Sequence, residues 1–377
     1  MSRILNYGMV GGGPGAFIGH AHRHSVALDE SAKLVAGCFS RDHEKCLRQG
    51  EELHLSPDRC YTSYLEMAQK EAAREDGIDF VTVVTPNSSH YEICKAFLEA
   101  GIHVACDKPV TVSFAQAQEL RDLAREKGLL FMVTYTYTGH VTAKYVGDLV
   151  RSGGIGDVRM VMAEYPQGWL AFPENDGGWR SDPAFSGPVN CLGDLGTHVE
   201  NIIATMTGLK IRRVLAKMDK KVEGHILDDN DSILVEYDTG ASGIYWVSQI
   251  AVGSDNSLKV RIYGSRGTVL WEQESPEKVT VIDADKTVRE IHRGHACVTE
   301  HAAGYARLPA GHPEGWYEAM ANLYHSFTAC VNAKKDGFFT DEMIDFPTIE
   351  DGAHGLAFVE ACLKSTENGN IWIPVEL

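Results

Sequence analysis

Short apolar runs alternate with amphipathic stretches along the first third of the chain. The apolar runs predict strands, and the stretches between them, in which apolar residues recur at helical spacing, predict helices. The predicted strands are residues 4–10, 34–39, 80–84, 103–106 and 129–134, and the predicted helices are residues 19–28, 42–53, 89–100 and 114–127. Strand–helix alternation at this spacing is typical of parallel strands joined by crossover helices. We therefore expect an α/β domain over residues 1–135, built on a doubly wound parallel sheet.

The alternation ends near residue 134, and a different pattern follows. Several β-rich runs succeed one another with turns between them, which indicates a mixed or antiparallel sheet. The predicted strands are residues 158–164, 233–237, 243–250, 258–263, 267–271 and 371–375, the helices are residues 141–152, 194–206, 316–333 and 349–367, and the long loops are residues 166–192 and 292–312. Loops of this length inside a compact domain are usually functional. We expect residues 136–377 to form an α+β domain with a large open sheet.

Composition and charge narrow the classes of function. The 377 residues carry a formal net charge of −17, which argues against nucleic acid or an anionic membrane surface as a partner, because both need clustered Lys and Arg. No signal peptide or membrane-spanning run is recognisable. The nine cysteines contain no CxxC pair and indicate reduced thiols. We expect a cytoplasmic protein that acts on a small molecule.

A glycine-rich loop lies between the first predicted strand and the first predicted helix. Gly11, Gly13 and Ala16 fit the pattern G-x-G-x-x-G/A. The first glycine of the pattern allows a tight turn, the second brings the backbone close to a pyrophosphate, and the small third residue lets the helix pack on the strand. Ligands of parallel sheets lie at the carboxyl ends of the strands, so the other strand ends should complete the site. The expected dinucleotide-binding residues are Gly11, Gly13, Gly15, Ala16, Phe17, Ile18, Ser40, Arg41, Thr85, Pro86, Asn87, Asp107, Lys108 and Pro109.

The end of the second predicted strand bears on the choice between NAD and NADP. An acid at this position would bind the adenosine ribose and repel a 2′-phosphate. This chain has Ser40 and Arg41, and Asp42 comes one position later. Arg41 can meet a 2′-phosphate or stack on the adenine, which favours NADP or dual use. Asp42 could still reach the ribose, so NAD remains an alternative.

Asp194, His198 and Lys108 carry candidate catalytic chemistry. Asp194 and His198 are four residues apart, so a helix would place them on one face, beside an apolar stripe. A carboxylate and an imidazole held in this way can bind a hydroxyl and remove its proton. The alternative is a helix cap and a half-buried histidine. Lys108 ends an apolar run, where an ammonium can stabilise a developing alkoxide, and its alternative is a solvated surface lysine.

Further histidines and aromatic residues lie in the loops and beside the glycine loop. The ring faces of Trp169 suit the C–H faces of a sugar, although the side chain could equally anchor its loop to the core. His301, Tyr305 and His312 could line a pocket or could be structural. His20, His22 and His24 suggest a metal site, but a third ligand with suitable spacing is lacking, so we predict no metal.

Four short motifs are spread along nearly the whole chain. They are the glycine loop with Ile18-Gly19-x-x-His22, then Thr85-Pro86-Asn87-x-x-His90, then Asp107-Lys108-Pro109, and finally Gly193-Asp194-x-Gly-x-His198. Together they resemble the glucose–fructose oxidoreductase / inositol dehydrogenase / MocA (Gfo/Idh/MocA) family. The resemblance implies a Rossmann domain, a second domain on a large mixed sheet, a homodimer or homotetramer, and a catalytic set of Lys108, Asp194 and His198.

Two features depart from the usual family pattern. Asp107 stands where the family usually has Glu, and the glycine loop is longer, so Gly13, Gly15 and Ala16 are alternatives for the pyrophosphate contact. We also expect His90, Trp179 and Arg180 at the cofactor, and Tyr137, Trp169, Arg180 and His312 with the catalytic set at the substrate.

Three hypotheses of function follow. The first is an NAD(P)-dependent dehydrogenase acting on a ring hydroxyl of a cyclitol, a sugar or a glycoside, in the last case at C3. His198 would be the base, Asp194 would bind a neighbouring hydroxyl, and Lys108 would stabilise the oxyanion. The second is a glycosidase with retained NAD that works by oxidation, elimination, hydration and reduction. The third, a sensor that binds nucleotide without catalysis, is the weakest because all three catalytic residues are present.

Overall fold

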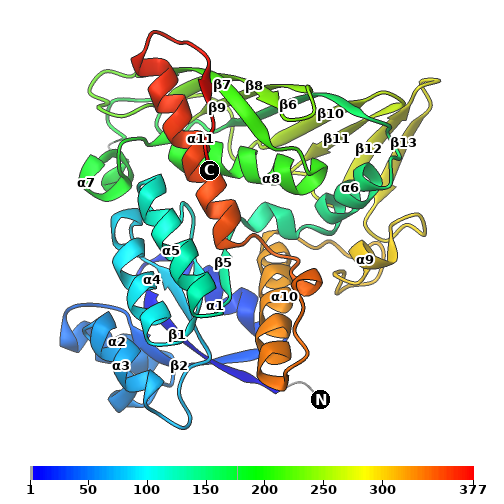
Figure 1. Ribbon diagram of the computed structural model, residues 1–377. Coiled ribbons are helices and arrows are strands. Elements are labelled where there is room, and N and C mark those ends of the chain that lie inside the picture. The colour runs from blue at the N-terminus through cyan, green and yellow to red at the C-terminus, as the bar shows by residue number, and fades with distance from the viewer. Residues whose placement is uncertain (1–2, 176) are drawn as a thin grey trace. The chain divides into compact units, whose positions relative to one another are not determined.

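Five parallel strands form the central sheet in the first of two units of the structure, a computed structural model that describes residues 3–175 and 177–377. The first unit comprises Met1–Thr136 and Met320–Ala353. Its strands are β1 Leu5–Gly11, β2 Ala32–Cys38, β3 Phe80–Val84, β4 His103–Cys106 and β5 Phe131–Val133, in the spatial order β2-β1-β3-β4-β5. Every neighbouring pair is parallel, which confirms the expected α/β sheet (Figure 1).

The helices of the first unit lie against this sheet. They are α1 Phe17–Ala27, α2 His43–Glu52, α3 Tyr64–Ala72, α4 His90–Glu99 and α5 Phe114–Glu126, with 3₁₀ turns at η1 Pro57–Arg59, η2 Asn87–Ser89 and η6 Asp341–Met343. Figure 1 shows α4 and α5 in front of the sheet and α1 behind it. Helix α3 is absent from the sequence prediction. Its apolar stripe is short, with Met67 and Ala68 buried, and Ser63 caps it by accepting a hydrogen bond from the Glu66 amide.

Two long helices near the end of the chain each have some residues in the first unit and some in the second. They are α10 Trp316–Asp336 and α11 Ile349–Glu367. Tyr324 and Phe327 of α10 pack on Phe80 of β3, with ring centroids 6.3 and 5.3 Å apart. The first unit therefore contains residues that the sequence prediction assigned to a domain of residues 136–377, because the apolar face of a helix does not tell which sheet it covers.

Nine strands form the sheet of the second unit, Tyr137–Ala319 and His354–Leu377. Its spatial order is β13-β12-β11-β10-β6-β9-β8-β7-β14. The strands are β6 Val158–Pro166, β7 Ile211–Asp219, β8 Asn230–Tyr237, β9 Ser242–Ser248, β10 Lys259–Gly264, β11 Gly267–Glu272, β12 Lys278–Asp283, β13 Val288–His292 and β14 Ile373–Pro374. Only the pair β6–β9 is parallel among these described strands. The expected large mixed sheet is confirmed.

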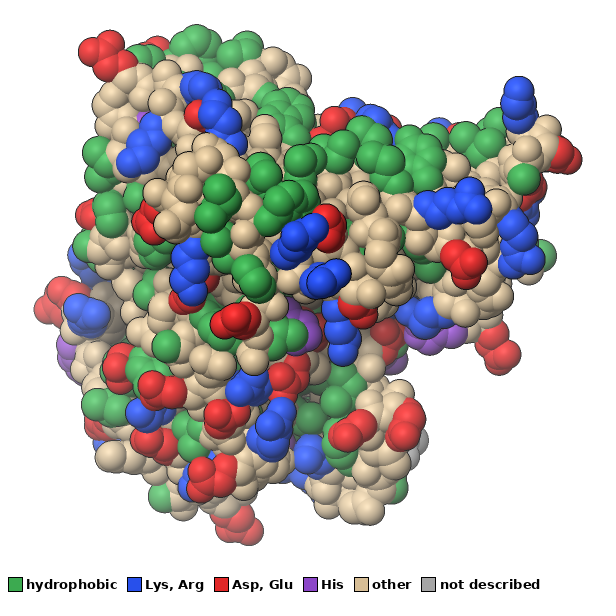
Figure 2. All heavy atoms as spheres, turned by 45° about the horizontal axis from the view of Figure 1, so that its top comes forward, with side chains coloured by type: hydrophobic (Ala, Val, Ile, Leu, Met, Phe, Trp, Pro, Cys, Tyr) green, Lys and Arg blue, Asp and Glu red, His purple; other side chains and the backbone are tan. Residues whose placement is uncertain are grey.

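One face of this large sheet is covered by helices, and the other is open. The remaining helices are α6 Val141–Arg151, α7 Pro183–Ser186, α8 Thr197–Thr207 and α9 Glu300–Ala303, with 3₁₀ turns at η3 Thr136–Gly139 and η4 Gly178–Ser181 and a π-helical turn at η5 Leu192–Gly196. Trp271, Tyr165, Tyr237 and Tyr245 are fully buried in the core of this unit. On the open face Leu234 of β8 pairs with Ile244 of β9, and these side chains are 43% and 37% exposed. Figure 2 shows hydrophobic side chains interspersed with charged ones over the surface that comes forward there.

The cysteines and the helix lengths agree with the sequence analysis. All nine cysteines are free thiols, and only Cys297 is exposed. Among the described residues, no helix combines the length and the apolar character needed to cross a bilayer.

Candidate active site

The glycine loop after β1 brings the main chain into very close contact with its surroundings. Gly11 and Gly12 have positive φ angles of 89° and 66°, which favour glycine. A Cβ at Gly11 would lie 2.7 Å from the Val84 oxygen, and one at Gly19 would lie 2.3 Å from the Gly12 Cα. The close approach of α1 to the strand end is therefore made by Gly19, whereas the sequence analysis gave this role to Ala16. The N-terminus of α1 and a preceding loop rich in glycine suit a pyrophosphate.

Ser40, Arg41 and Asp42 follow β2. The Ser40 hydroxyl accepts a hydrogen bond from the Asp42 amide at 3.1 Å. Asp42 Oδ1 accepts from the Lys45 amide at 2.9 Å and caps the N-terminus of α2. Arg41 is exposed. One carboxylate oxygen of Asp42 is thus hydrogen-bonded to the N-terminus of α2, and the exposed guanidinium of Arg41 belongs to the segment that follows β2.

His90 joins the ends of β3 and β4. Its Nε2 lies 2.8 Å from the Thr85 oxygen and its Nδ1 lies 2.9 Å from the Pro109 oxygen. Burial lowers the pKa of His90, while Asp107 and the two carbonyl groups act in the opposite direction. Because both ring nitrogens face main-chain oxygens, His90 braces the cofactor edge of the sheet rather than offering a nitrogen to a ligand.

Lys108 follows β4 in the first unit. Asp107 Oδ1 accepts hydrogen bonds from the Lys108 amide at 2.9 Å and from the Thr134 hydroxyl at 3.2 Å. The peptide bond between Lys108 and Pro109 is cis. Asp107 therefore holds the main chain at the residue that the sequence predicts to be catalytic. It does so with a shorter side chain than the family's usual Glu.

The motif histidine His22 is fully buried under the sheet. Its Nδ1 lies 2.6 Å from the hydroxyl of Tyr324, and that hydroxyl lies 3.2 Å from Thr82 Oγ1. Burial lowers the pKa of His22 to about 4, so the ring is neutral at pH 7. His20 and His24 stack on each other with centroids 3.8 Å apart. His22 therefore has other contacts than the stacked pair of His20 and His24.

Asp194 lies in a π-helical turn and His198 in the helix that follows it. The turn η5 covers Leu192–Gly196 and passes into α8 at Thr197, so the regular helix predicted from Asp194 begins three residues later than expected. Turns of this kind are often found at functional sites. Asp194 Oδ2 accepts a hydrogen bond of 3.0 Å from Gln249 Nε2.

Two tyrosines surround His198 in the second unit. The rings of Tyr137 and Tyr165 have centroids 4.7 and 6.1 Å from the His198 ring. The two tyrosine hydroxyls lie 2.6 Å apart. Burial, and after it the neighbouring Tyr137 and Asp194, raise the pKa of Tyr165 well above its ordinary value. The polar groups beside His198 thus form one buried cluster that includes the expected substrate residue Tyr137.

A chain of hydrogen bonds connects this cluster with the loop after β6. Asn256 accepts from the Tyr165 hydroxyl at 2.6 Å and from Gln167 Nε2 at 2.8 Å. Gln167 in turn accepts from Trp169 Nε1 at 2.8 Å. Trp169 is 38% exposed, so its ring is available at the end of this chain. Asn256 and Gln167 are absent from the sequence-based site because nothing in their local pattern distinguishes them.

The other expected site residues of the second unit lie in separate contacts. Arg180 lies over the ring of Trp179 at 4.6 Å. His312 is exposed, and its main-chain oxygen accepts a hydrogen bond from Arg293. His301 lies 3.0 Å from Asp148 and packs edge-on against Tyr305. The side chain of His301 thus contacts Asp148 and Tyr305, whereas His312 stays a predicted substrate residue with an exposed side chain.

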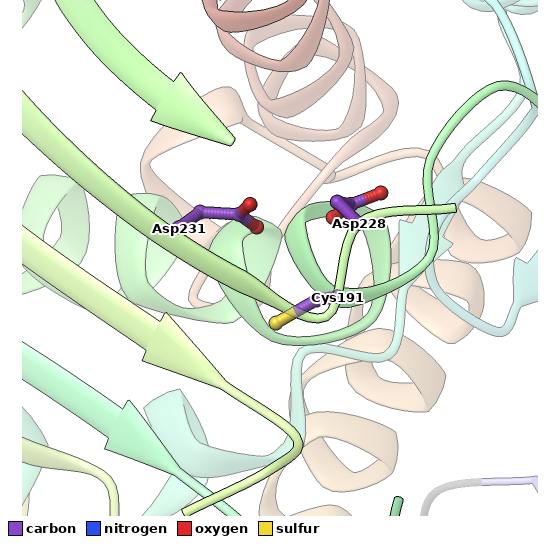
Figure 3. Close-up of side chains that lie close together, drawn as sticks. All are labelled: Cys191, Asp228 and Asp231. Carbon is purple, nitrogen blue, oxygen red and sulfur yellow. The ribbon is translucent and has the colours of Figure 1, made fainter. Parts of the chain in front are cut away.

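A buried cluster that the sequence analysis missed lies beside the π-helical turn. Cys191, Asp228 and Asp231 are the one group of metal-ligating side chains among the described residues whose ligand atoms lie within 4.8 Å of one another (Figure 3). Asp228 accepts hydrogen bonds of 2.7 Å from the amides of Asn190 and Leu192. Burial raises the pKa of Asp228, and burial together with Asp228 raises that of Asp231 further. A carboxylic acid at Asp231 can therefore donate to Asp228 without a metal ion.

Comparisons with known proteins agree with this combination of a nucleotide loop and a polar cluster. The family model described as "Oxidoreductase family, NAD-binding Rossmann fold" matches residues 5–135, and the GFO/IDH/MocA C-terminal domain matches residues 143–270. The uncharacterized oxidoreductase YfiI of Bacillus subtilis is 35% identical, over 99% of this chain and 97% of its own.

Solved structures extend the comparison to the whole fold. An inositol dehydrogenase homolog from Azotobacter vinelandii, complexed with NAD⁺, superposes with a TM-score of 0.95 at 35% identity, covering 99% of this chain and 97% of its own. Its complex with NADH and myo-inositol gives a TM-score of 0.93 at 34% identity, covering 99% and 98%. The fold and the site define an NAD(P)-dependent oxidoreductase. The chain belongs to the Gfo/Idh/MocA oxidoreductase family.

Proposed function

We propose that this enzyme oxidises a ring hydroxyl carbon of a cyclitol or sugar, with myo-inositol as the first substrate to test. The observation that carries the proposal is the half-buried Asp194 close to the buried His198, Tyr137 and Tyr165, an arrangement that offers a carboxylate and an imidazole to a polyhydroxylated ring. The Azotobacter homolog with bound myo-inositol supports the substrate class. A glycoside oxidised at C3 is the finer alternative within the same chemistry.

Each catalytic residue has one role in this proposal. His198 accepts the hydroxyl proton, because an imidazole can hold a proton near neutral pH. Asp194 accepts a hydrogen bond from a neighbouring hydroxyl and thereby orients the ring. Lys108 donates to the oxygen on which negative charge develops. The bound nicotinamide supplies the hydride acceptor.

We propose NADP or dual use for the cofactor. The exposed Arg41 at the end of β2 supports this assignment, since a guanidinium suits a 2′-phosphate. The use of Asp42 as the cap of α2 supports it as well, because an N-capping carboxylate is directed to the helix amides.

We also propose that the enzyme is a homodimer or homotetramer that associates through the open face of the large sheet. A row of cross-strand neighbours on this face is apolar over four strands: Leu215, Leu234, Ile244 and Met162. Exposed apolar rows of this kind are typical of interfaces. A second copy of this chain is the partner that the family resemblance implies.

The decisive experiment follows nicotinamide absorbance and aglycone release in the same sample. The panel contains inositols, free hexoses and aryl glucosides, each with NAD and with NADP. Reduction of the nucleotide in step with substrate loss, without aglycone, supports the dehydrogenase. Aglycone release without net reduction would instead establish the glycosidase that retains its nicotinamide.

Lys108→Ala tests the catalytic assignment within that experiment. We expect kcat to fall by about 10²-fold or more, as for the loss of an oxyanion donor, while nucleotide binding measured by calorimetry stays close to that of the wild type. Lys127→Ala, which changes an exposed lysine after α5, is the matched control. Full activity in the Lys108 variant would contradict the assignment.

A further inference from the structure

Asp194 is held by a chain of two amide side chains from other parts of the second unit. Gln249 Nε2 donates to Asp194 Oδ2 at 3.0 Å, and Asn190 Nδ2 donates to Gln249 Oε1 at 2.7 Å. We infer that Gln249 and Asn190 are positioning residues that orient the Asp194 carboxylate toward substrate. This inference rests on the proposed role of Asp194.

The direction of these hydrogen bonds follows from the chemistry of the groups. An ionised carboxylate only accepts hydrogen bonds, so Gln249 must present its amide nitrogen to Asp194. Its oxygen then faces Asn190, which must in turn present its own amide nitrogen. The negative charge of Asp194 therefore determines the orientation of both side-chain amides. In this orientation Gln249 and Asn190 both stabilise the ionised form of Asp194.

The Asn190 end of this series of hydrogen bonds is anchored to the side-chain carboxylate of Asp228, which comes from another part of the second unit. The amides of Asn190 and Leu192 both donate to the Asp228 carboxylate at 2.7 Å, which Figure 3 shows beside Cys191 and Asp231. The Asn190 oxygen accepts from the Asp194 amide at 2.9 Å. We call the series of hydrogen bonds from Asn190 through Gln249 to Asp194 the relay. Asn190 and Asp194, its two end residues, are thus also joined directly by a main-chain hydrogen bond.

Gln249 is also fixed through its own main chain. Its amide donates to the Asp229 oxygen, and its oxygen accepts from the Leu170 amide, both at 2.9 Å. Gln249 is fully buried and Asn190 is 6% exposed. Because burial keeps both amides from substrate, they act through Asp194. Among the described residues, Tyr165 and Cys191 are titratable groups whose pKa values the charge of Asp194 helps to raise.

Two substitutions each place an oxygen instead of an amide nitrogen against Asp194, with little change in side-chain volume. Gln249→Glu places a carboxylate against Asp194, and the two cannot both ionise at this distance. Asn190→Asp makes Gln249 turn its nitrogen toward residue 190, so that its oxygen faces Asp194. Both changes disfavour the ionised form of Asp194. Gln118→Glu, on α5 of the first unit, is the matched control.

The first readout is the pH dependence of kcat/KM. Protonation of His198 and of Asp194 both lower kcat/KM at acidic pH. We expect kcat/KM of Gln249→Glu and Asn190→Asp to fall about tenfold or more below the wild-type value at the acidic end of the profile, and to return toward the wild-type value as the pH rises and Asp194 ionises. The control should keep the wild-type profile. Near-UV circular dichroism checks that each variant retains its packing, because a merely structural defect would lower activity equally at every pH.

The second readout needs no substrate. The ¹³C-carboxyl signal of Asp194, identified by its loss in Asp194→Asn, is titrated in protein labelled with [¹³C]aspartate. A higher midpoint in both variants supports the relay, and an unchanged midpoint together with an unchanged pH profile overturns it. If the wild type oxidised no polyol, the proposed function would fail, and this titration would still decide whether Gln249 and Asn190 control Asp194.

Discussion

Asp231→Asn should change how the stability of the protein depends on pH. Burial, with the neighbouring Asp228, raises the pKa of Asp231 well above its ordinary value. Between about pH 4 and the raised pKa the folded chain holds a proton that the unfolded chain has released. The contribution of this group to stability is therefore greatest at low pH and falls as pH rises. An asparagine at position 231 can still donate a hydrogen bond to Asp228 through its side-chain amide, but it does not titrate.

The size of the effect follows from proton linkage. A difference of one bound proton changes the free energy of unfolding by about 1.4 kcal/mol per pH unit. While the folded wild type holds the proton on Asp231, the difference between variant and wild type therefore grows by about this amount with each pH unit, in favour of the variant. His22 and His140, whose pKa values burial lowers to about 4, titrate in both proteins and drop out of the difference.

The assay is urea denaturation of the wild type and Asp231→Asn from pH 4.5 to 7.5, followed by circular dichroism, with metal analysis of both samples. The variant should gain stability relative to the wild type at each step up in pH. A difference that does not vary with pH would refute the shared-proton interpretation. So would one equivalent of a transition metal in the wild type that Asp231→Asn loses, since Cys191, Asp228 and Asp231 would then be metal ligands.

Two further predictions concern the cofactor and the oligomer. Arg41→Ala should raise the KM for NADP about tenfold, which corresponds to a loss of about 1.4 kcal/mol of binding free energy, and should leave the KM for NAD unchanged. The control Arg48→Ala, on α2, should alter neither KM. Equal effects of Arg41→Ala on both nucleotides would count against a 2′-phosphate contact. Leu234→Lys should dissociate the dimer or tetramer into smaller species, as measured by light scattering, because it places a charge opposite Ile244. The control Leu65→Lys should leave the oligomer unchanged. A monomeric wild type would contradict the proposed interface.

The fold was predictable wherever a local pattern decides it. Most strand and helix ranges of the first unit, with the exception of α3, follow from apolar spacing, and Phe80–Val84 and His103–Cys106 agree at both ends. The assignment of α10 was not predictable in this way. Tyr324 reaches His22 and Thr82 across more than two hundred residues of sequence, and apolar residues at helical spacing carry no information about the partner surface.

The glycine loop shows the same limit at the scale of single residues. The motif predicted that a small residue would let the helix approach the strand, and the structure has this contact at Gly12 and Gly19. With several glycines in succession, alternative alignments of the motif are equally good. Only the path of the backbone distinguishes Ala16, which precedes α1, from Gly19 within it.

The candidate site divides between chemistry that local spacing reveals and orientation that distant residues impose. Asp194 and His198 were identifiable because a carboxylate and an imidazole at helical spacing suit proton transfer from a hydroxyl. The π-helical turn that carries Asp194 was not, since Asp228, from 36 residues further along, binds the amide that opens it. Gln249 comes from further still, at a separation of 55 residues from Asp194. The inferred role of Gln249 depends on its hydrogen bond to the Asp194 carboxylate. This role could not be read from the sequence, because only the fold brings the two residues together.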